Sequence, residues 1–197
     1  MALSSPVIET PNFRLRPLRL EDAPVVCAYL PDPAIQRYLD QPVREVRAAR
    51  EAFAAMQRLS RLTRVGDAIC LAVERRSDRS VLGHVTLRWA DATAGQGEVR
   101  IVLAPEHRGH GHGGEVMRAM LAHSFETLGL HRISARCGPS PAAIGLLTSL
   151  GMRMEAHFRE HALFQGNWDE ELHFALLKRE WHRPAKVTAL VTRAHVA

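Results

Sequence analysis

The sequence contains little lysine, few cysteines and no long apolar run, and each scarcity excludes a class of protein. Lysine occurs only at positions 178 and 186, and the formal net charge of +5 comes from arginines spread along the chain, which gives no lysine-rich arm for nucleic acid. The three cysteines, at positions 27, 70 and 137, form no CxxC pair, which argues against a disulfide framework and against a zinc site. No apolar run approaches the ~20 residues of a membrane span, so no membrane partner is expected.

The remaining composition is that of an ordinary globular protein. The 197 residues, 46% of them hydrophobic and 24% charged, suffice for one domain with a sizeable core. The first residues lack the basic and apolar segments of a signal peptide, so a cytoplasmic location is expected. No repeat or linker divides the chain. We assign residues 10–182 to the domain and residues 183–197 to a C-terminal tail without a clear pattern.

Hydrophobic periodicity and turn residues predict one mixed α/β domain. Strands are expected at 12–18, 67–74, 81–89, 98–103, 132–137, 154–163 and 170–177. Helices are expected at 21–30, 34–39, 44–62, 115–128 and 142–150. Ser140 and Pro141 suit the N-cap and the first position of the last of these helices.

The strongest local signal is a glycine-rich segment between a strand and a helix, residues 108–114, called the glycine loop below. Its glycines allow a tight turn, and the N–H groups at the start of the following helix favour a phosphate. No Lys-Ser/Thr pair follows, which excludes a nucleoside-triphosphate P-loop. Gly109, Gly111 and Gly114 fit GxGxxG, but a β-hairpin precedes the strand, unlike the start of a dinucleotide-binding βαβ unit.

These segments resemble the GNAT superfamily of acyl-CoA-dependent N-acyltransferases over about residues 10–181. Arg108-x-x-Gly111-x-Gly113 is similar to the pyrophosphate loop of that superfamily, [Gln/Arg]-x-x-Gly-x-[Gly/Ala], and residues 143–152 resemble its short helix ending in Leu-Gly-[Phe/Met]. Residues 10–18 and Gly-x-Trp-x-Asp at 166–169 are similar to the ribosomal-protein-alanine (Rim-type) branch. The implied GNAT fold, of class α/β (α+β), is a central mixed, mostly antiparallel sheet flanked by helices.

The resemblance implies acetyl-CoA as co-substrate. Its pyrophosphate would bind the glycine loop, its pantetheine arm would lie along strand 98–103, and its thioester would sit where that strand and strand 132–137 diverge. The cofactor-binding residues so implied are Ile101, Val102, Leu103, Arg108, Gly109, His110, Gly111, His112, Gly113, Gly114 and Ser140. His107, His110 and His112 alternate like metal ligands, but no Cys or paired carboxylate completes a shell, so no metal is expected.

The proton-transfer groups are less clearly marked. Glu98 matches the acidic residue that opens this strand in the Rim-type branch, and it is the candidate general base. The usual tyrosine acid has no match, because Tyr29 and Tyr38 lie far upstream. At the branch's Asn-x-x-Ser positions the chain has Ser140 and Ala143, and Ala143 cannot donate a proton. The leaving-group acid stays open among Cys137, Ser140, Thr148 and water.

The sequence thus predicts an N-acyltransferase that carries acetyl from acetyl-CoA to a primary amine, either a peptide or protein N-terminus or a small molecule. Phe158 and Phe164 are candidates for lining its acceptor groove. Because the acid is missing, a catalytically weak CoA-binding sensor or interaction module is the alternative. A nucleic-acid-binding module is disfavoured for want of a basic stripe. A homodimer through sheet edges is left open.

Overall fold

The computed structural model describes residues 6–36, 43, 45–164, 166–181 and 190–192. The strands are β1 (Val7–Glu9), β2 (Phe13–Pro17), β3 (Ala68–Arg75), β4 (Val81–Asp91), β5 (Gln96–Leu103), β6 (Arg132–Cys137), β7 (Arg153–Phe164), β8 (Asn167–Leu177) and β9 (Leu190–Thr192). The α-helices are α1 (Ala23–Tyr29), α2 (Pro33–Gln36), α3 (Val46–Gln57), α4 (His112–Ala122) and α5 (Pro141–Ser149). A π-helical turn at His123–Thr127 continues α4.

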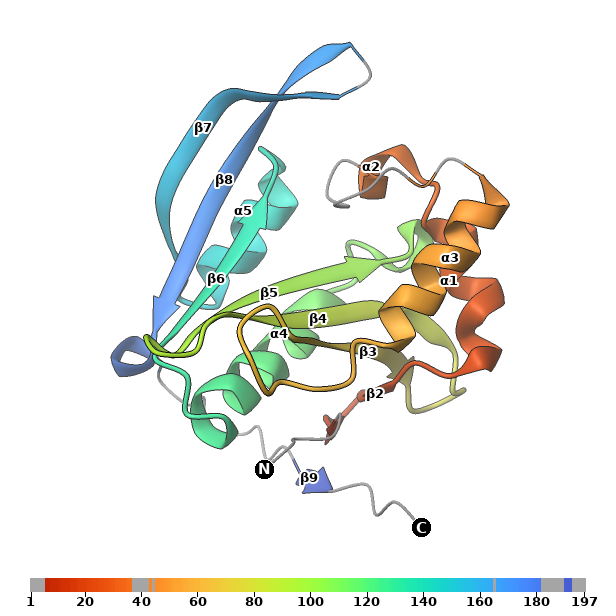
Figure 1. The fold of residues 1–197 in the computed structure, drawn as a ribbon, viewed down its shortest axis with the longest axis horizontal. Helices are drawn as coiled ribbons and strands as arrows, with labels where there is room; N and C mark the ends of the chain where they lie inside the picture. Colours follow the sequence, from red (N-terminus) through yellow and green to blue (C-terminus); the bar gives the residue numbers. More distant parts are fainter. Residues whose placement is uncertain (1–5, 37–42, 44, 165, 182–189, 193–197) are drawn as a thin grey trace.

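Within these residues the strands form one twisted sheet in the order β7-β8-β6-β5-β4-β3-β2-β1-β9 (Figure 1). Neighbours run antiparallel except β5 and β6, which are parallel. Helices α1 and α3 lie on one side of the sheet and α4 on the other, and the long β7–β8 hairpin extends past β6 toward α2 (Figure 1). This arrangement confirms the expected mixed, mostly antiparallel sheet flanked by helices.

The elements differ from the expectations mainly at the two ends of the chain and in α3. The helix expected at 44–62 is wrong at its C-terminal end, because α3 stops at Gln57. There Cys70 donates its backbone N–H to the Leu59 carbonyl, and Ser60 bridges Ile69, so residues after α3 pair with β3. Of the helix expected at 34–39, the described part is α2 (Pro33–Gln36), and residues 37–42 lie outside the described part of the chain.

The sheet also contains two short strands that the periodicity did not reveal. β1 pairs with β2, and β9, from the segment assigned to the tail, pairs with β1 on its other edge. Three residues each are too few to show alternation. The strands expected from residue 67 onward are confirmed, with the expected bounds for β6 and shifted ends for the others.

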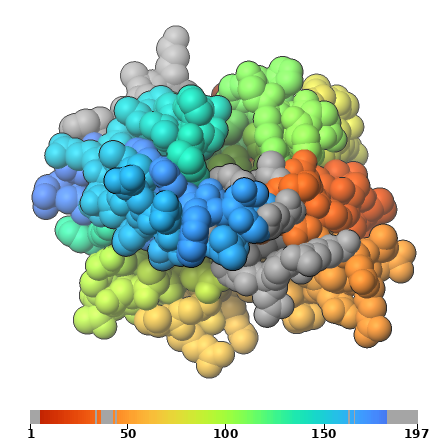
Figure 2. Space-filling model, turned by 90° about the horizontal axis from the view of Figure 1, so that it is seen from above, coloured from red at the N-terminus to blue at the C-terminus, as the bar shows by residue number. Residues whose placement is uncertain are grey.

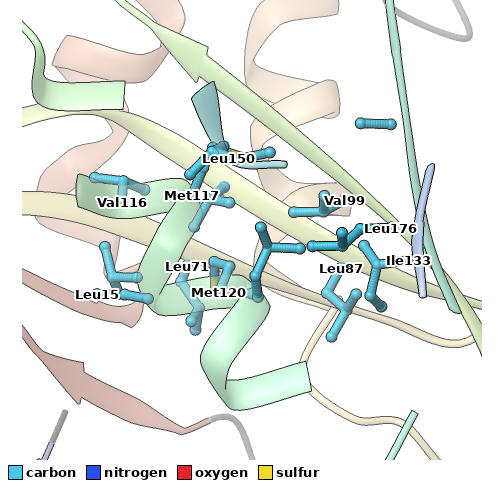
Figure 3. Packing of buried hydrophobic residues seen from close by; sticks show 14 of the residues in the cluster. Leu15, Leu71, Leu87, Val99, Val116, Met117, Met120, Ile133, Leu150 and Leu176 are labelled. Carbon is cyan, nitrogen blue, oxygen red and sulfur yellow. The ribbon is translucent and has the colours of Figure 1, made fainter. Parts of the chain in front are cut away.

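The larger core lies between the sheet and α4. Met117 and Met120 from α4 pack against Leu71, Leu87 and other apolar side chains of the central strands (Figure 3). A second cluster on the opposite face joins α1 and α3 to the same strands. Because both faces are covered, β3 is buried along nearly its whole length. These two layers hold β4 and β5 rigidly, and β5 carries the site described below.

Gly83 lets β4 and β5 approach closely at the end of β5. Gly83 pairs with Leu103, and a Cβ atom at Gly83 would lie 2.1 Å from the Val102 carbonyl oxygen and 2.8 Å from the Leu103 Cα. Such distances are not sterically possible, so only glycine fits there. The close contact fixes the last residues of β5 against β4.

A buried charged cluster joins β2, the turn before α1, and β3. The Arg16 guanidinium donates to both carboxylate oxygens of Asp22, at 2.7 and 2.9 Å, and through Nε to Glu74 at 2.6 Å. All three residues are at most 7% exposed. The hydrogen bond to Asp22 is the largest cause that raises the pKa of Arg16, so this guanidinium stays charged. The cluster connects residues 58 positions apart.

Among the described residues, none of the helices has the length and apolar character that crossing a bilayer would require.

A buried histidine in β4 makes stability depend on pH. Burial, with the nearby charge of Arg100, lowers the pKa of His84 to about 4, and its Nδ1 lies 2.8 Å from the Tyr29 hydroxyl. Between pH 6.5 and 4 the unfolded chain therefore binds the extra proton and the folded chain does not, so stability falls as the pH falls. We expect this group to remove about 2–3 kcal/mol of unfolding free energy over that window.

Urea unfolding of wild type and His84→Gln at several pH values measures this effect, since glutamine takes up no proton. The variant should show a shallower loss of stability between pH 6.5 and 4. The remaining slope includes His123, whose pKa burial also lowers to about 4. Parallel pH profiles for the two proteins would contradict the expectation.

Candidate active site

The site begins where β5 and β6 separate. The two strands pair only at Gln96↔Arg132, Gly97↔Ile133 and Glu98↔Ser134, and no further pairs join them among the described residues. Beyond this point β5 stays with β4 up to Leu103, while β6 stays with β8 up to Leu172. The divergence expected between these strands is therefore present, and it opens a gap along one side of β5.

The glycine loop closes one end of this gap. Gly109 and Gly111 have φ values of +77° and +79°, and a Cβ at either would meet open space, so the glycines serve backbone conformation rather than packing. Gly111 is the N-cap of α4, which begins at His112. The first N–H groups of a helix have no partner within it, and with the helix dipole they favour an anion. The loop is thus built as an anion cradle.

Two contacts fix the position of the loop. Arg108 donates from Nε to the Leu103 carbonyl at 2.9 Å, which ties the loop to the end of β5. A Cβ at Gly113 would lie 3.3 Å from Cδ2 of Leu146, so α4 and α5 pack closely there. The cradle is therefore held by β5 on one side and by α5 on the other.

A cavity of about 770 Å³ joins the glycine loop to the gap beside β5. Its walls also include the end of β6, the start of α5, α2 and the base of the turn between β7 and β8. In the view of Figure 2 the β7–β8 hairpin (blue) lies beside α5 (teal) and faces the α1–α3 segment (orange). The cavity thus runs from an anion cradle to a part of the wall formed by α2 and the turn of the β7–β8 hairpin.

This cavity collects the residues that the sequence implied for the cosubstrate, with one exception. Its lining includes Ile101, Val102, Leu103, Arg108, Gly109, Gly111, His112, Gly113, Gly114 and Ser140. His110 instead lines a neighbouring hollow with Arg75 and Arg76. A long groove that ends in positive-φ glycines at a helix N-terminus fits an extended cosubstrate with a pyrophosphate. The role of each residue in binding stays a prediction.

The loop histidines pack against each other and against the core. The rings of His110 and His112 stack at 5.6 Å, and His112 meets Phe13 edge-on at 5.2 Å. No group of three or more His, Cys, Asp or Glu with metal-binding geometry occurs among the residues that the structure describes. The spacing of two residues thus places the rings of His110 and His112 against each other.

Of the residues considered as proton donors to the leaving group, some line the cavity and one does not. Cys137 and Ser140 line the cavity, together with Ala143, whereas Thr148 is not among the lining residues. Burial raises the pKa of the Cys137 thiol. Ser140 is the N-cap of α5, as expected, but its hydroxyl makes no capping hydrogen bond.

The two tyrosines give no replacement acid in the described part of the chain. Tyr29 is buried against His84, outside the cavity lining, and Tyr38 lies among residues that the structure does not describe. The methyl group of Ala143 stands in the wall where the resemblance implies a serine. Cys137, Ser140 and water therefore stay the candidate proton donors to the leaving group.

Glu98 lies beside the cavity but not in its lining. It is the last residue of β5 that pairs with β6, and its Oε1 accepts from Arg136 Nε and Nη2 at 3.0 and 2.9 Å and from Arg100 Nη2 at 3.4 Å. Both arginines line the cavity. This ion-pair network extends from Arg136 to Glu171 on β8 at 3.7 Å. The role of Glu98 as general base stays a prediction.

The sequence did not predict that Arg100 and Arg136 line the cavity, nor that Trp168 and Asp169 do. Arg100 and Arg136 carry no motif, and their meeting depends on the register of β5, β6 and β8. Phe164 lines the cavity, as do Trp168 and Asp169, whereas Phe158 packs outside it against His161 and His173. Phe158 is thus not among the cavity-lining residues, and its place in an acceptor groove stays a prediction.

Comparisons with known proteins agree with this geometry. Residues 12–153 match the family described as Acetyltransferase (GNAT) domain. The chain is 30% identical over 174 residues to the uncharacterized N-acetyltransferase p20 of Bacillus licheniformis, covering 87% of this chain and 96% of that protein.

Two solved structures share the fold. An acetyltransferase of the GNAT family from Bacillus anthracis superposes with a TM-score of 0.75 at 21% identity, over 88% of this chain and 99% of that one. A spermidine N-acetyltransferase from Vibrio cholerae, solved with CoA and spermine, superposes with a TM-score of 0.72 at 22% identity, over 85% and 96%. With the glycine loop, the parted strands and the family match together, the chain belongs to the GNAT family of N-acetyltransferases.

Proposed function

We propose that this chain transfers an acetyl group from acetyl-CoA to the primary amine of a small molecule or of a peptide N-terminus. The observation that carries the proposal is the cavity that connects the glycine loop, the side of β5 that parts from β6, and the wall formed by α2 and the turn of the hairpin. Acetyl-CoA supplies an activated thioester, which an amine attacks directly. The C–N bond forms, the C–S bond breaks, and CoA leaves as a thiolate that takes a proton from Cys137, Ser140 or water. The acceptor enters from the side opposite the glycine loop.

Different groups of the chain then bind the pyrophosphate, bind the pantetheine arm and take up the amine proton. The glycine loop and the N-terminus of α4 hold the pyrophosphate, and Arg108 keeps that loop against β5. Backbone groups of Ile101–Leu103 hold and orient the pantetheine arm through hydrogen bonds. Glu98 takes the amine proton, directly or through water, and a backbone N–H of the parted strands stabilises the oxygen that becomes negative.

A CoA-binding sensor with weak catalysis remains the second candidate, and specific observations favour it. Ala143 offers no proton, and the carboxylate of Glu98 is engaged by two guanidinium groups. Both features weaken proton transfer without affecting the anion cradle. The two candidates therefore share cosubstrate binding and differ in turnover.

Calorimetric titration with acetyl-CoA and a thiol-release assay with a panel of amines and peptides separate these candidates. The acetyltransferase binds acetyl-CoA and turns over with at least one acceptor, and Glu98→Gln lowers kcat while acetyl-CoA affinity is kept. Glu51→Gln, an exposed change on α3, is the matched control. Binding of acetyl-CoA without turnover on any acceptor would support the CoA-binding sensor and contradict the acetyltransferase. Absence of acetyl-CoA binding would refute both candidates.

A further inference from the structure

The charges in the acceptor half of the cavity are unexpected for a site that receives an amine. Arg100 and Arg136 line this part of the wall, and Asp169 is the carboxylate that lines it among the described residues. The carboxylates of Glu98 and Glu171, which contact Arg136, are not in the lining. A ligand in the cavity therefore meets guanidinium groups before it meets those carboxylates.

The two arginines converge because of the way the strands separate. Arg100 lies two residues beyond the last pair on β5, and Arg136 lies two residues beyond it on β6. Their side chains reach the same oxygen of Glu98 from the two sides of the gap. The gap thus has a guanidinium on each wall and a carboxylate between them.

The negative charges of the cosubstrate do not explain why Arg100 and Arg136 line this part of the cavity. Its phosphates belong to the glycine loop, which Arg108 and the start of α4 already serve. The place where the strands part is where the thioester and the acceptor meet, and the thioester itself is uncharged. Glu98 and Glu171 contact these guanidinium groups from outside the cavity lining, so an anion that reaches them from within the cavity would come from the acceptor.

We propose that the acceptor is an amine that also carries a carboxylate, in the simplest case a free amino acid, and that Arg100 and Arg136 bind that carboxylate. This inference rests on the proposed function. Planar guanidinium groups recognise carboxylates through paired, charge-assisted hydrogen bonds. The same placement puts the neighbouring ammonium group beside Glu98, which lies between the arginines.

The proposal separates this chain from enzymes that acetylate polyamines. Spermine and spermidine are polycations, and two guanidinium groups at the point of reaction repel them. Phe164 and Trp168 form an apolar part of the wall that suits the side chain of an amino acid. The acceptor is thus a small zwitterion.

The experiment measures thiol release from acetyl-CoA with free L-amino acids, the corresponding amino-acid amides, phosphoethanolamine and spermidine. The best amino acid should exceed its amide in kcat/KM by at least about 10-fold, because the amide loses charge-assisted hydrogen bonds. Calorimetry of that amino acid on CoA-bound protein gives a readout independent of turnover. Phosphoethanolamine tests whether a phosphate replaces the carboxylate.

The variants Arg100→Gln and Arg136→Gln should raise KM for the amino acid at least about 10-fold and leave acetyl-CoA affinity unchanged, while Arg136→Lys should lie in between. Arg58→Gln, an exposed arginine just after α3, is the matched control. Intact acetyl-CoA binding also shows that each variant is folded.

Three results would overturn the inference while leaving the acetyltransferase intact. They are equal rates for amides and acids, a preference for spermidine, phosphoethanolamine or peptides, and loss of acetyl-CoA affinity in the arginine variants. Absence of both acetyl-CoA binding and turnover in wild type would instead refute the proposed function, and this inference with it.

Discussion

The double variant Gly111→Asp/Gly113→Asp should bind acetyl-CoA on the order of 1000-fold more weakly than wild type. Two carboxylates would occupy the start of α4, where the proposed pyrophosphate sits. Like charges about 4 Å apart near a protein surface repel by about 4 kcal/mol, which corresponds to this loss of affinity. Steric effects act in the same direction, because Gly111 has φ +79° and a Cβ at Gly113 presses on Leu146. Isothermal titration of both proteins with acetyl-CoA measures the difference.

A strained glycine at the other end of the same helical segment provides the control. Gly129 has φ +71° and open space around it, so Gly129→Asp imposes similar backbone strain and one added charge far from the cradle. We expect this variant to keep wild-type acetyl-CoA affinity and to lose only stability. Unchanged affinity in the double variant, or an equal loss in both variants, would show that the glycine loop is not the pyrophosphate site.

Arg16→Met should lower the free energy of unfolding by about 3–5 kcal/mol, the cost of leaving buried charges without a partner. The guanidinium contacts both Asp22 and Glu74, and neither carboxylate is exposed enough to be hydrated in its place. Because Asp22 also accepts the N–H of Arg19, the turn that starts α1 loses its anchor on the sheet. Urea unfolding followed by circular dichroism measures the loss.

Removing the charges together tests whether the loss arises from unpaired charge or from the missing side chain. The triple variant Arg16→Met/Asp22→Asn/Glu74→Gln has no buried charge in this cluster and should recover much of the lost stability. Arg14→Met is the matched control, since that arginine is on the same strand but its side chain is 47% exposed. If the triple variant is no more stable than Arg16→Met, shape rather than charge explains the effect.

Local features of the site were predictable from the sequence because the residues involved are close along the chain. The strand ending before Pro105, the glycines and the helix after them all lie within residues 96–122, and each requires only local backbone conformation. Gly109 and Gly111 have the positive φ that such a turn needs. Ser140 and Pro141 likewise begin α5 as expected.

Features that depend on strand order were not predictable. Arg136 meets Glu98 because β6 is parallel to β5 in one register, and Glu171 joins them because β8 inserts beside β6. No periodicity in a single segment encodes this order. Arg16 and Glu74 are similarly remote, 58 residues apart, and their strands pair only in the folded sheet. Exposed and buried arginines therefore look alike in the sequence.

The separation of β5 from β6 also affects the free energy of ligand binding, because backbone groups that face the gap exchange hydrogen bonds with water. Backbone N–H and C=O groups of β5 beyond Glu98 that turn toward the gap have water as their alternative partner, except the Leu103 carbonyl, which accepts from Arg108. A ligand amide that replaces such a water exchanges one hydrogen bond for another, a net gain of only about 0.5–1.5 kcal/mol each. Under the proposed function, β5 would therefore align the pantetheine arm more than it would hold it. Tight binding would then come from charge at the glycine loop, and alignment of the thioester from the strand.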